Sequence, residues 1–348
     1  MKTEALEKVQ ESLSEKRNQV AAWLQTTPAP KKQAYLGPAD ERAVETHLHV
    51  IDSTLDKAAA GILGVCSVCH QAIEPELVEM DYTSGVCLDD LAPEQKRSLE
   101  FELELAQSVQ RSLLPQQVPT IPGLEVAAFS RPAQIVGGDY FDFFSWDDGA
   151  HGLAIADVAG HGISASLHMA SVQTLLRTLV PASPSPVAVV QQLQRLLLHN
   201  VHFSTFVTLF LAALDPATGQ LTYCNAGHPP PLLFCSEGEP RGYLRWLEPT
   251  GAAVALIEGL EFQAATTRMR PGDLLLLYTD GLTEAMNQNG EQFGRERLGQ
   301  LAGQASTLPA RALLQALRRG LEDFIGGRSL SDDVTVVVCR SVNGSLTT

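Results

Sequence analysis

The sequence of 348 residues has no long apolar run and no excess of basic residues. No run reaches the roughly 18 apolar residues that a membrane-spanning helix needs, so we expect a soluble protein without a membrane partner. Lys and Arg number 25 against 40 Asp and Glu, which gives a formal net charge of −15. Because nucleic-acid backbones bind to basic surfaces, this charge argues against direct nucleic-acid binding.

Cysteines are few and unevenly spread. Cys66, Cys69 and Cys87 lie close together, and the other three are scattered in or beside apolar segments. This is not the disulfide framework of a secreted protein, so the thiols are expected to bind metal or pack in a core. The first twenty residues are charged and lack the apolar region of a signal peptide, and we therefore expect a cytoplasmic protein.

The N-terminal third has the pattern of helices. Apolar residues at helical spacing predict helices over 4–24 and 41–60, and three prolines between them predict a loop, so the two helices are expected to form a hairpin. Residues 61–91 are rich in turns. A third helix is predicted over 93–114, with proline in its first turn and Pro115 after its end.

After Pro122 the pattern changes to strands separated by turns. The predicted strands are LEVAAFS, HGLAIADV, TFVTLFLAALD, QLTYCNAG, PLLFC, DLLLLYTD and DVTVVVC, and helices are predicted over 162–180, 185–199, 294–303 and 308–325. Strands in hairpin order with helices grouped between them favour the α+β class, in which helices cover sheets.

Aspartates recur where these strands begin or end. Asp139 follows a Gly-Gly pair, Asp157 and Asp280 follow apolar strands, and Asp332–Asp333 precede one. An Asp beside Gly is also a common turn residue, so the pattern alone leaves convergence open. If these carboxylates do converge, their repulsion requires a cation, and hard oxygen ligands select Mg²⁺ or Mn²⁺.

A resemblance to a known family covers roughly residues 100–340. The chain contains, in order, LAQSVQRSLLP, GGDYFD, IADVAGHGISASL, FVTLFLAALD, NAGHPPPLL, LLLYTDGLTEA and SDDVTVVV. It resembles the bacterial PPM-type protein serine/threonine phosphatases of the SpoIIE/RsbU branch. The resemblance implies a β-sandwich of two antiparallel sheets flanked by helices, with two Mn²⁺ or Mg²⁺ ions that activate a water to hydrolyse phosphoserine or phosphothreonine.

The same resemblance implies roles for individual residues. Asp157 would bridge the two metals and the backbone carbonyl of Val158 would complete one of them, whereas Asp280 and Asp332 would bind the second. Asp139 would bind directly or through water, and Asp333 would bind or orient ligands. His161 is a candidate general acid, although its offset from Asp157 differs from that in eukaryotic relatives and a structural role is the alternative. His228 is expected to pack or to support a neighbouring ligand rather than to catalyse.

The region before the third helix resembles a second family. LHVIDSTLDKAAAGILGVCSVCHQAIEPELVEMDYTSGVCLDDL is similar to the zinc-binding part of DksA/TraR-type proteins, in which a helical hairpin reaches into RNA polymerase. Cys66, Cys69 and Cys87 fit the expected spacing, but Asp90 stands where the fourth Cys is expected. Three alternatives follow: Asp90 completes a Zn²⁺ site, His70 takes the place of Asp90 as the fourth ligand, or the module has lost its zinc.

These observations predict three parts: a helical hairpin with a zinc-finger-like module (1–91), a linker helix (92–115) and a phosphatase domain (116–342). The resemblance implies that the linker helix joins two chains in a homodimer and switches activity, the alternative being an ordinary docking helix. By family analogy the substrate is a phosphorylated anti-anti-sigma (STAS) factor. One alternative is a DksA-like transcription effector that binds RNA polymerase or senses zinc or redox state and carries the phosphatase domain as a secondary part. Another is that the first hundred residues are only a structural dimerisation module with an incomplete zinc site. The absence of an acidic hairpin tip weakens polymerase binding.

Overall fold

The computed structural model describes residues 41–74, 78, 83, 85–90, 92–160, 162–200, 205–236 and 242–342, with separate residues between 10 and 25. The chain divides into two compact units, residues 1–102 and 103–348, and each is described by itself. None of the described helices is both long enough and apolar enough to span a bilayer.

The N-terminal unit contains helix α3 (Glu41–Ala59), the short helix η1 (Leu88–Asp90) and the first residues of α5 (Pro93–Leu113). Around its cysteines a small core forms from Cys66, Ile73, Val78 and Cys87. The predicted helix over 4–24 and the loop that follows lie largely outside the described residues, although Arg17 forms a 2.9 Å ion pair with Asp52 of α3.

The second unit is built on two antiparallel five-stranded sheets. One sheet has the order β1 (Leu124–Arg131), β10 (Val334–Ser341), β9 (Leu274–Tyr278), β6 (Leu232–Cys235) and β7 (Tyr243–Trp246). The other has the order β2 (Tyr140–Ser145), β3 (His151–Val158), β4 (Val207–Leu214), β5 (Gln220–Ala226) and β8 (Ala265–Arg268).

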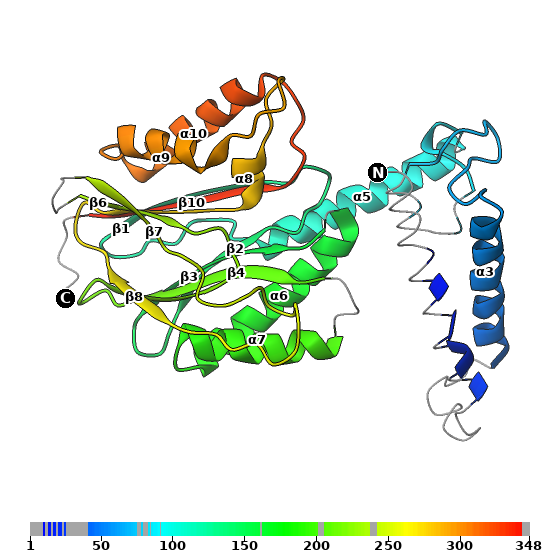
Figure 1. Cartoon of the computed structure of the whole chain (residues 1–348), viewed down its shortest axis with the longest axis horizontal. Helices are drawn as coiled ribbons and strands as arrows, with labels where there is room; N and C mark the ends of the chain where they lie inside the picture. Colours follow the sequence, from blue (N-terminus) through cyan, green and yellow to red (C-terminus); the bar gives the residue numbers. More distant parts are fainter. Residues whose placement is uncertain are drawn as a thin grey trace. The chain divides into compact units, whose positions relative to one another are not determined.

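Three apolar cores hold this unit together in four layers (Figure 1). The inner faces of both sheets pack on each other through residues such as Ile155, Phe210 and Leu277. Helices α6 (Gly162–Ala182) and α7 (Pro186–Asn200) cover the outer face of the β2–β8 sheet. Helices α9 (Gly294–Gln304) and α10 (Ala310–Ile325) cover the other outer face, and the short α8 (Asp280–Glu284) joins that layer.

This arrangement confirms the predicted α+β class with two antiparallel sheets flanked by helices. Three strands escaped prediction: β2, β7 and β8. Strand β2 was missed because Asp142 interrupts its aromatic run. Strands β7 and β8 were missed because they are largely exposed edge strands with polar residues, so their sequences lack the pattern of a buried apolar strand. The predicted boundaries of the three parts remain predictions, and α5 crosses the division between the two units.

Candidate metal centre

The aspartates predicted to bind metal come together from both sheets. Strands β2 and β3 pair in antiparallel register, so Asp139, just before β2, lies at the same end as Asp157 near the end of β3. Strands β9 and β10 pair in the same way, which brings Asp280 and Asp332 to one end of the other sheet. The charges of Asp280 and Asp332 both act on Asp157, so these two sheet ends face each other.

Burial and mutual repulsion make this group electrostatically strained without a cation. Burial, followed by the charges of Asp280, Asp332 and Asp333, raises the pKa of Asp157 to about 8. Burial, followed by Asp157 and Asp333, raises the pKa of Asp139 well above its usual range. Burial and Asp332 also raise the pKa of Asp280. Carboxylates in such surroundings suit divalent cations with oxygen ligands.

The aspartates are not gathered into one compact group of ligands. Among the described side chains, no three of these aspartates place oxygens all within 4.8 Å of one another, so the carboxylates spread more widely than the ligands of a single compact site. Asp157 is central among them, because the charges of Asp280, Asp332 and Asp333 all act on it.

Asp333 holds the loop in front of β2. Its two carboxylate oxygens accept 2.7 Å hydrogen bonds from the backbone N–H groups of Ala133 and Gly138, 200 and 195 residues away. The loop passes so close that a Cβ on Gly137 would lie 1.9 Å from Asp333 Oδ2, and one on Gly138 would lie 2.7 Å from the carbonyl oxygen of Val158. The glycine pair is therefore needed for close packing against Asp333 and Val158.

Two polar residues support this loop without having been predicted. The hydroxyl of Thr279 donates to Asp139, and Gln110 of α5 bonds to both backbone groups of Gly137 through its side-chain amide. The sequence signal for both is weak, because a Thr before Asp280 and a Gln in an amphipathic helix are ordinary residues. Only the packing of distant segments reveals their role.

Of the two candidate histidines, His161 and His228, the structure describes His228. His161 lies outside the described residues. His228 is buried, with its Nδ1 at 2.8 Å from the hydroxyl of Thr208 and its Nε2 at 3.1 Å from the carbonyl oxygen of Tyr278. Since a carbonyl only accepts, Nε2 carries the proton and Nδ1 accepts from Thr208. His228 thus ties β4 to the end of β9.

A second cluster of potential ligands lies in the N-terminal unit. Atoms of Cys66, Cys69, Cys87 and Asp90 all lie within 4.8 Å of one another. Asp90 Oδ2 is 3.2 Å from the Cys66 sulfur and 3.1 Å from the Cys87 sulfur, and the sulfurs of Cys69 and Cys87 are 3.7 Å apart. The exposed His70, weighed as a substitute for Asp90, is not a member of the group.

Comparison with known proteins decides the family. The model of the family "Stage II sporulation protein E (SpoIIE)" matches residues 147–342. Phosphoserine phosphatase RsbU of Bacillus subtilis is 31% identical over 248 residues, which cover 70% of this chain and 71% of RsbU. The chain belongs to the SpoIIE family. It is therefore a protein serine/threonine phosphatase.

Two solved structures agree with this membership of the SpoIIE family. The PP2C domain of SiaA from Pseudomonas aeruginosa has a TM-score of 0.64 at 22% identity and matches 72% of this chain and 99% of that domain, which shows the shared fold. The RsbU and RsbW domains of a Mycobacterium tuberculosis protein give a TM-score of 0.55 at 30% identity, over 67% of this chain and 64% of that one. The SpoIIE family match begins at residue 147, beyond the cysteine cluster.

Proposed function

We propose that this phosphatase hydrolyses phosphoserine or phosphothreonine in a protein substrate at a binuclear Mn²⁺ or Mg²⁺ centre. The observation that carries the proposal is the meeting of Asp139, Asp157, Asp280 and Asp332 from four separate strand ends, with the pKa values of three of them raised by burial and by one another. When bound, two divalent ions supply a water acidic enough to act as a nucleophile near neutral pH.

Each of the candidate residues would have its own role in binding these two ions. Asp157 would be the ligand shared by both ions, the carbonyl of Val158 would complete one, and Asp280 and Asp332 would bind the other. Asp139 binds directly or through a water. Asp333, whose oxygens are occupied by two backbone N–H groups, orients the loop that delivers Asp139. The proposed general acid His161 remains a prediction to be tested by substitution.

The proposed metal mechanism is tested by measuring turnover and metal binding of the full chain. Wild type, Asp157→Asn and Asp280→Asn are assayed on a phosphopeptide with Mn²⁺, and Mn²⁺ binding is measured by calorimetry. Asp148→Asn serves as the control, because Asp148 lies in the turn at the opposite end of β2 and β3. We expect both ligand substitutions to abolish turnover and weaken Mn²⁺ binding while the control stays active. A wild type that binds no Mn²⁺ would refute the metal mechanism.

The proposed biological role is regulatory, in a partner-switching system with a phosphorylated STAS-type anti-anti-sigma factor as substrate. It is supported by the similarity to Bacillus subtilis RsbU, a phosphoserine phosphatase, and to a Mycobacterium tuberculosis protein that carries RsbU and RsbW domains. The test compares dephosphorylation of a phosphorylated STAS protein with that of a peptide bearing the same phosphosite. Equal catalytic efficiency on both would contradict a dedicated protein substrate.

A homodimer through α5 is part of the same proposal. Residues Phe101, Leu105 and Val109 recur every fourth position and are 65%, 54% and 52% exposed, so they form an apolar stripe along the helix. The bonds of Gln110 to Gly137 give this helix a direct connection to the loop before Asp139, which supports regulation through α5. Light scattering of Leu105→Glu against the exposed Glu104→Gln tests the dimer, and an unchanged mass for Leu105→Glu would refute it.

For the N-terminal unit we infer a Zn²⁺ site formed by three thiolates and Asp90. The mutual proximity of the four ligand atoms supports it, and zinc accepts sulfur and carboxylate ligands in tetrahedral sites. This favours the zinc-sensing part of the alternative function. RNA polymerase binding through a hairpin tip stays a prediction, because residues 26–40 lie outside the described residues.

Metal analysis of the purified chain tests the zinc site. We expect one Zn²⁺ per chain, loss of that zinc in Cys87→Ser, weaker retention in Asp90→Ala, and full retention in Cys235→Ser, whose thiol is buried in the sandwich core. Zinc retained by Cys87→Ser would contradict the assignment. So would a wild type that takes up no zinc after refolding with the metal.

A further inference from the structure

The strand that starts directly after Asp139 contains a second buried carboxylate outside the proposed metal-binding set. Asp142 in β2 is 2% exposed and lies opposite Ala154 of β3. Alternate residues of β2 face alternate sides, and Tyr140 belongs to the core beneath α6 and α7. Asp142 shares that face. A buried carboxylate is costly unless charged and polar partners compensate for its lost hydration.

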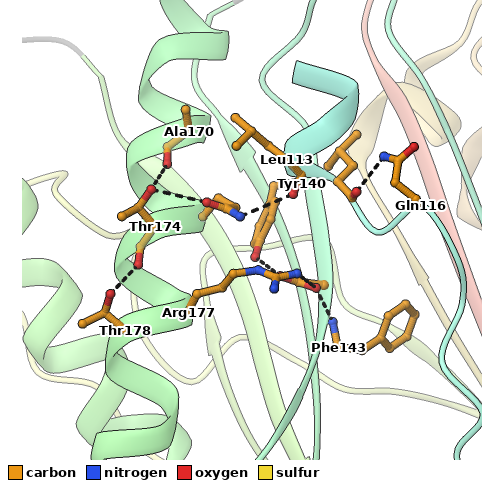
Figure 2. Close-up of polar contacts among 11 residues, drawn as sticks. Leu113, Gln116, Tyr140, Phe143, Ala170, Thr174, Arg177 and Thr178 are labelled. Atoms are coloured by element: carbon orange, nitrogen blue, oxygen red, sulfur yellow. Dashed lines mark hydrogen bonds and ion pairs between the residues drawn. The ribbon is translucent and has the colours of Figure 1, made fainter. Parts of the chain in front are cut away.

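Arg177 of α6 supplies the compensating charge through a bidentate ion pair with Asp142. Its Nε lies 2.8 Å from Asp142 Oδ2 and its Nη2 lies 3.0 Å from Oδ1. The hydroxyl of Tyr140 donates to Oδ2 at 2.6 Å, and the backbone N–H of Phe143 donates to Oδ1 at 2.8 Å. Figure 2 shows the side chain of Arg177 reaching from its helix to the hydroxyl end of Tyr140. Only arginine presents such a planar fork to a carboxylate.

The place of this link in the chain connects it to the metal centre. Tyr140 is fully buried, follows Asp139 directly and pairs with Ala156, the residue before Asp157. Helix α6 begins at Gly162, shortly after the strand that ends with Val158. The ion pair therefore fastens the helix that follows Asp157 to the strand that follows Asp139.

We propose that Arg177 is a positioning residue for the phosphatase reaction: through Asp142 and Tyr140 it fixes the backbone carrying Asp139 against the β3–α6 segment carrying Asp157. This inference rests on the metal centre of the proposed function, and it identifies Arg177 as a residue that affects how tightly that centre binds divalent metal. Arg177 touches neither ions nor substrate in this role. Its removal loosens the attachment of α6 to β2 while the pairing of β2 with β3 remains, so the ligands are held less firmly and the chain binds divalent metal more weakly.

The test separates positioning from general stability by measuring Mn²⁺ binding in the absence of substrate. Calorimetric titration of the full chain is carried out on wild type, Arg177→Lys, Arg177→Met and Asp142→Asn, and the Mn²⁺ dependence of turnover is measured alongside. Supporting residues around metal ligands typically change metal affinity by about 10–100-fold. We expect the Kd for Mn²⁺ to rise about tenfold in Arg177→Met and less in Arg177→Lys, with turnover partly restored by excess Mn²⁺.

Asp273→Asn is the matched control. Asp273 is also 2% exposed and also accepts several hydrogen bonds, from Ser236 and the N–H of Arg270, but it lies before β9 at the end opposite Asp280. It should lower the melting temperature as Asp142→Asn does, without changing the Kd for Mn²⁺. The inference is overturned if Arg177→Met and Asp142→Asn bind Mn²⁺ like wild type, or if Asp273→Asn weakens binding equally. Failure of wild type to bind Mn²⁺ would instead overturn the metal centre and this inference together.

Discussion

The hydroxyl of Thr279 donates a 2.8 Å hydrogen bond to Oδ2 of Asp139, from the end of β9 in one sheet to the start of β2 in the other. The same hydroxyl accepts a 2.9 Å bond from the backbone N–H of Thr335 in β10. Thr279 is completely buried and directly precedes Asp280. One side chain thus connects the three strand ends that carry Asp139, Asp280 and Asp333.

Replacing Thr279 by Val keeps its shape and removes both hydrogen bonds. A buried group left unpaired costs about 1–3 kcal/mol, and two groups are affected, so we expect the free energy of unfolding to fall by at least about 2 kcal/mol. The Kd for Mn²⁺ should rise because Asp139 loses the hydroxyl that holds its Oδ2. Urea denaturation and calorimetry measure the two effects.

Thr279→Ser is the control for this prediction, since it retains the hydroxyl and loses only a methyl group, worth about 1 kcal/mol. It should bind Mn²⁺ like wild type. Equal Mn²⁺ affinity of the Val and Ser variants would show that the hydroxyl does not position Asp139.

The aspartates that we propose bind metal could be predicted from the sequence, whereas the residues that support them could not. Asp157 ends an apolar strand and Asp280 follows another, so local pattern and family resemblance both pointed to them. Arg177 and Thr279 act through partners 35 and 140 residues away. No local pattern encodes such a pairing, because it depends on which helix packs on which strand.

Gly281 is predicted to be irreplaceable for steric reasons. A Cβ at this position in α8 would lie 2.0 Å from the backbone carbonyl oxygen of Asp333, closer than any real contact. Gly281→Ala must therefore push α8 away from the start of β10, which displaces Asp280 relative to Asp332. We expect a loss of about 1–3 kcal/mol of stability, as for overpacked cores, and weaker Mn²⁺ binding.

Gly303→Ala is the matched control, because a Cβ on that residue of α9 meets no atom within 4 Å. Alanine favours a helix over glycine by up to about 1 kcal/mol, so this variant should be as stable as wild type or more so. Thermal unfolding of both variants tests the pair. A Gly281→Ala protein with wild-type stability and Mn²⁺ affinity would contradict the close packing of α8 and β10.

The three strands that were not predicted from the sequence, β2, β7 and β8, also depend on packing that a local sequence pattern does not encode. Strand β2 carries the buried Asp142, which reads as a turn or surface residue until Arg177 is placed beside it. Strands β7 and β8 are sheet edges whose exposed polar residues give no apolar alternation. Prediction succeeded where burial leaves a periodic apolar pattern, and it failed where a polar residue is buried or a strand is exposed.

His228 is predicted to make the fold sensitive to acid. Burial lowers the pKa of its imidazole to about 3, against an ordinary value of 6.5, and both ring nitrogens are engaged by Thr208 and Tyr278. Between these two values the unfolded chain binds a proton that the folded chain does not. The contribution of neutral His228 is therefore complete above pH 6.5 and is lost as the pH falls towards 3.

Comparison of wild type with His228→Gln isolates this contribution, because the raised pKa values of Asp139 and Asp157 act in both proteins. Urea denaturation with a chelator present, at several pH values from 7.5 to about 4.5, gives the free energy of unfolding of each. At pH 7.5 His228→Gln should be the less stable, since Gln cannot span Thr208 and Tyr278 in the same way. Below pH 6 the difference should shrink by up to about 1.4 kcal/mol per pH unit, because only wild type carries the proton-linked loss. A difference that stays constant over this range would mean that His228 accepts a proton in the folded protein.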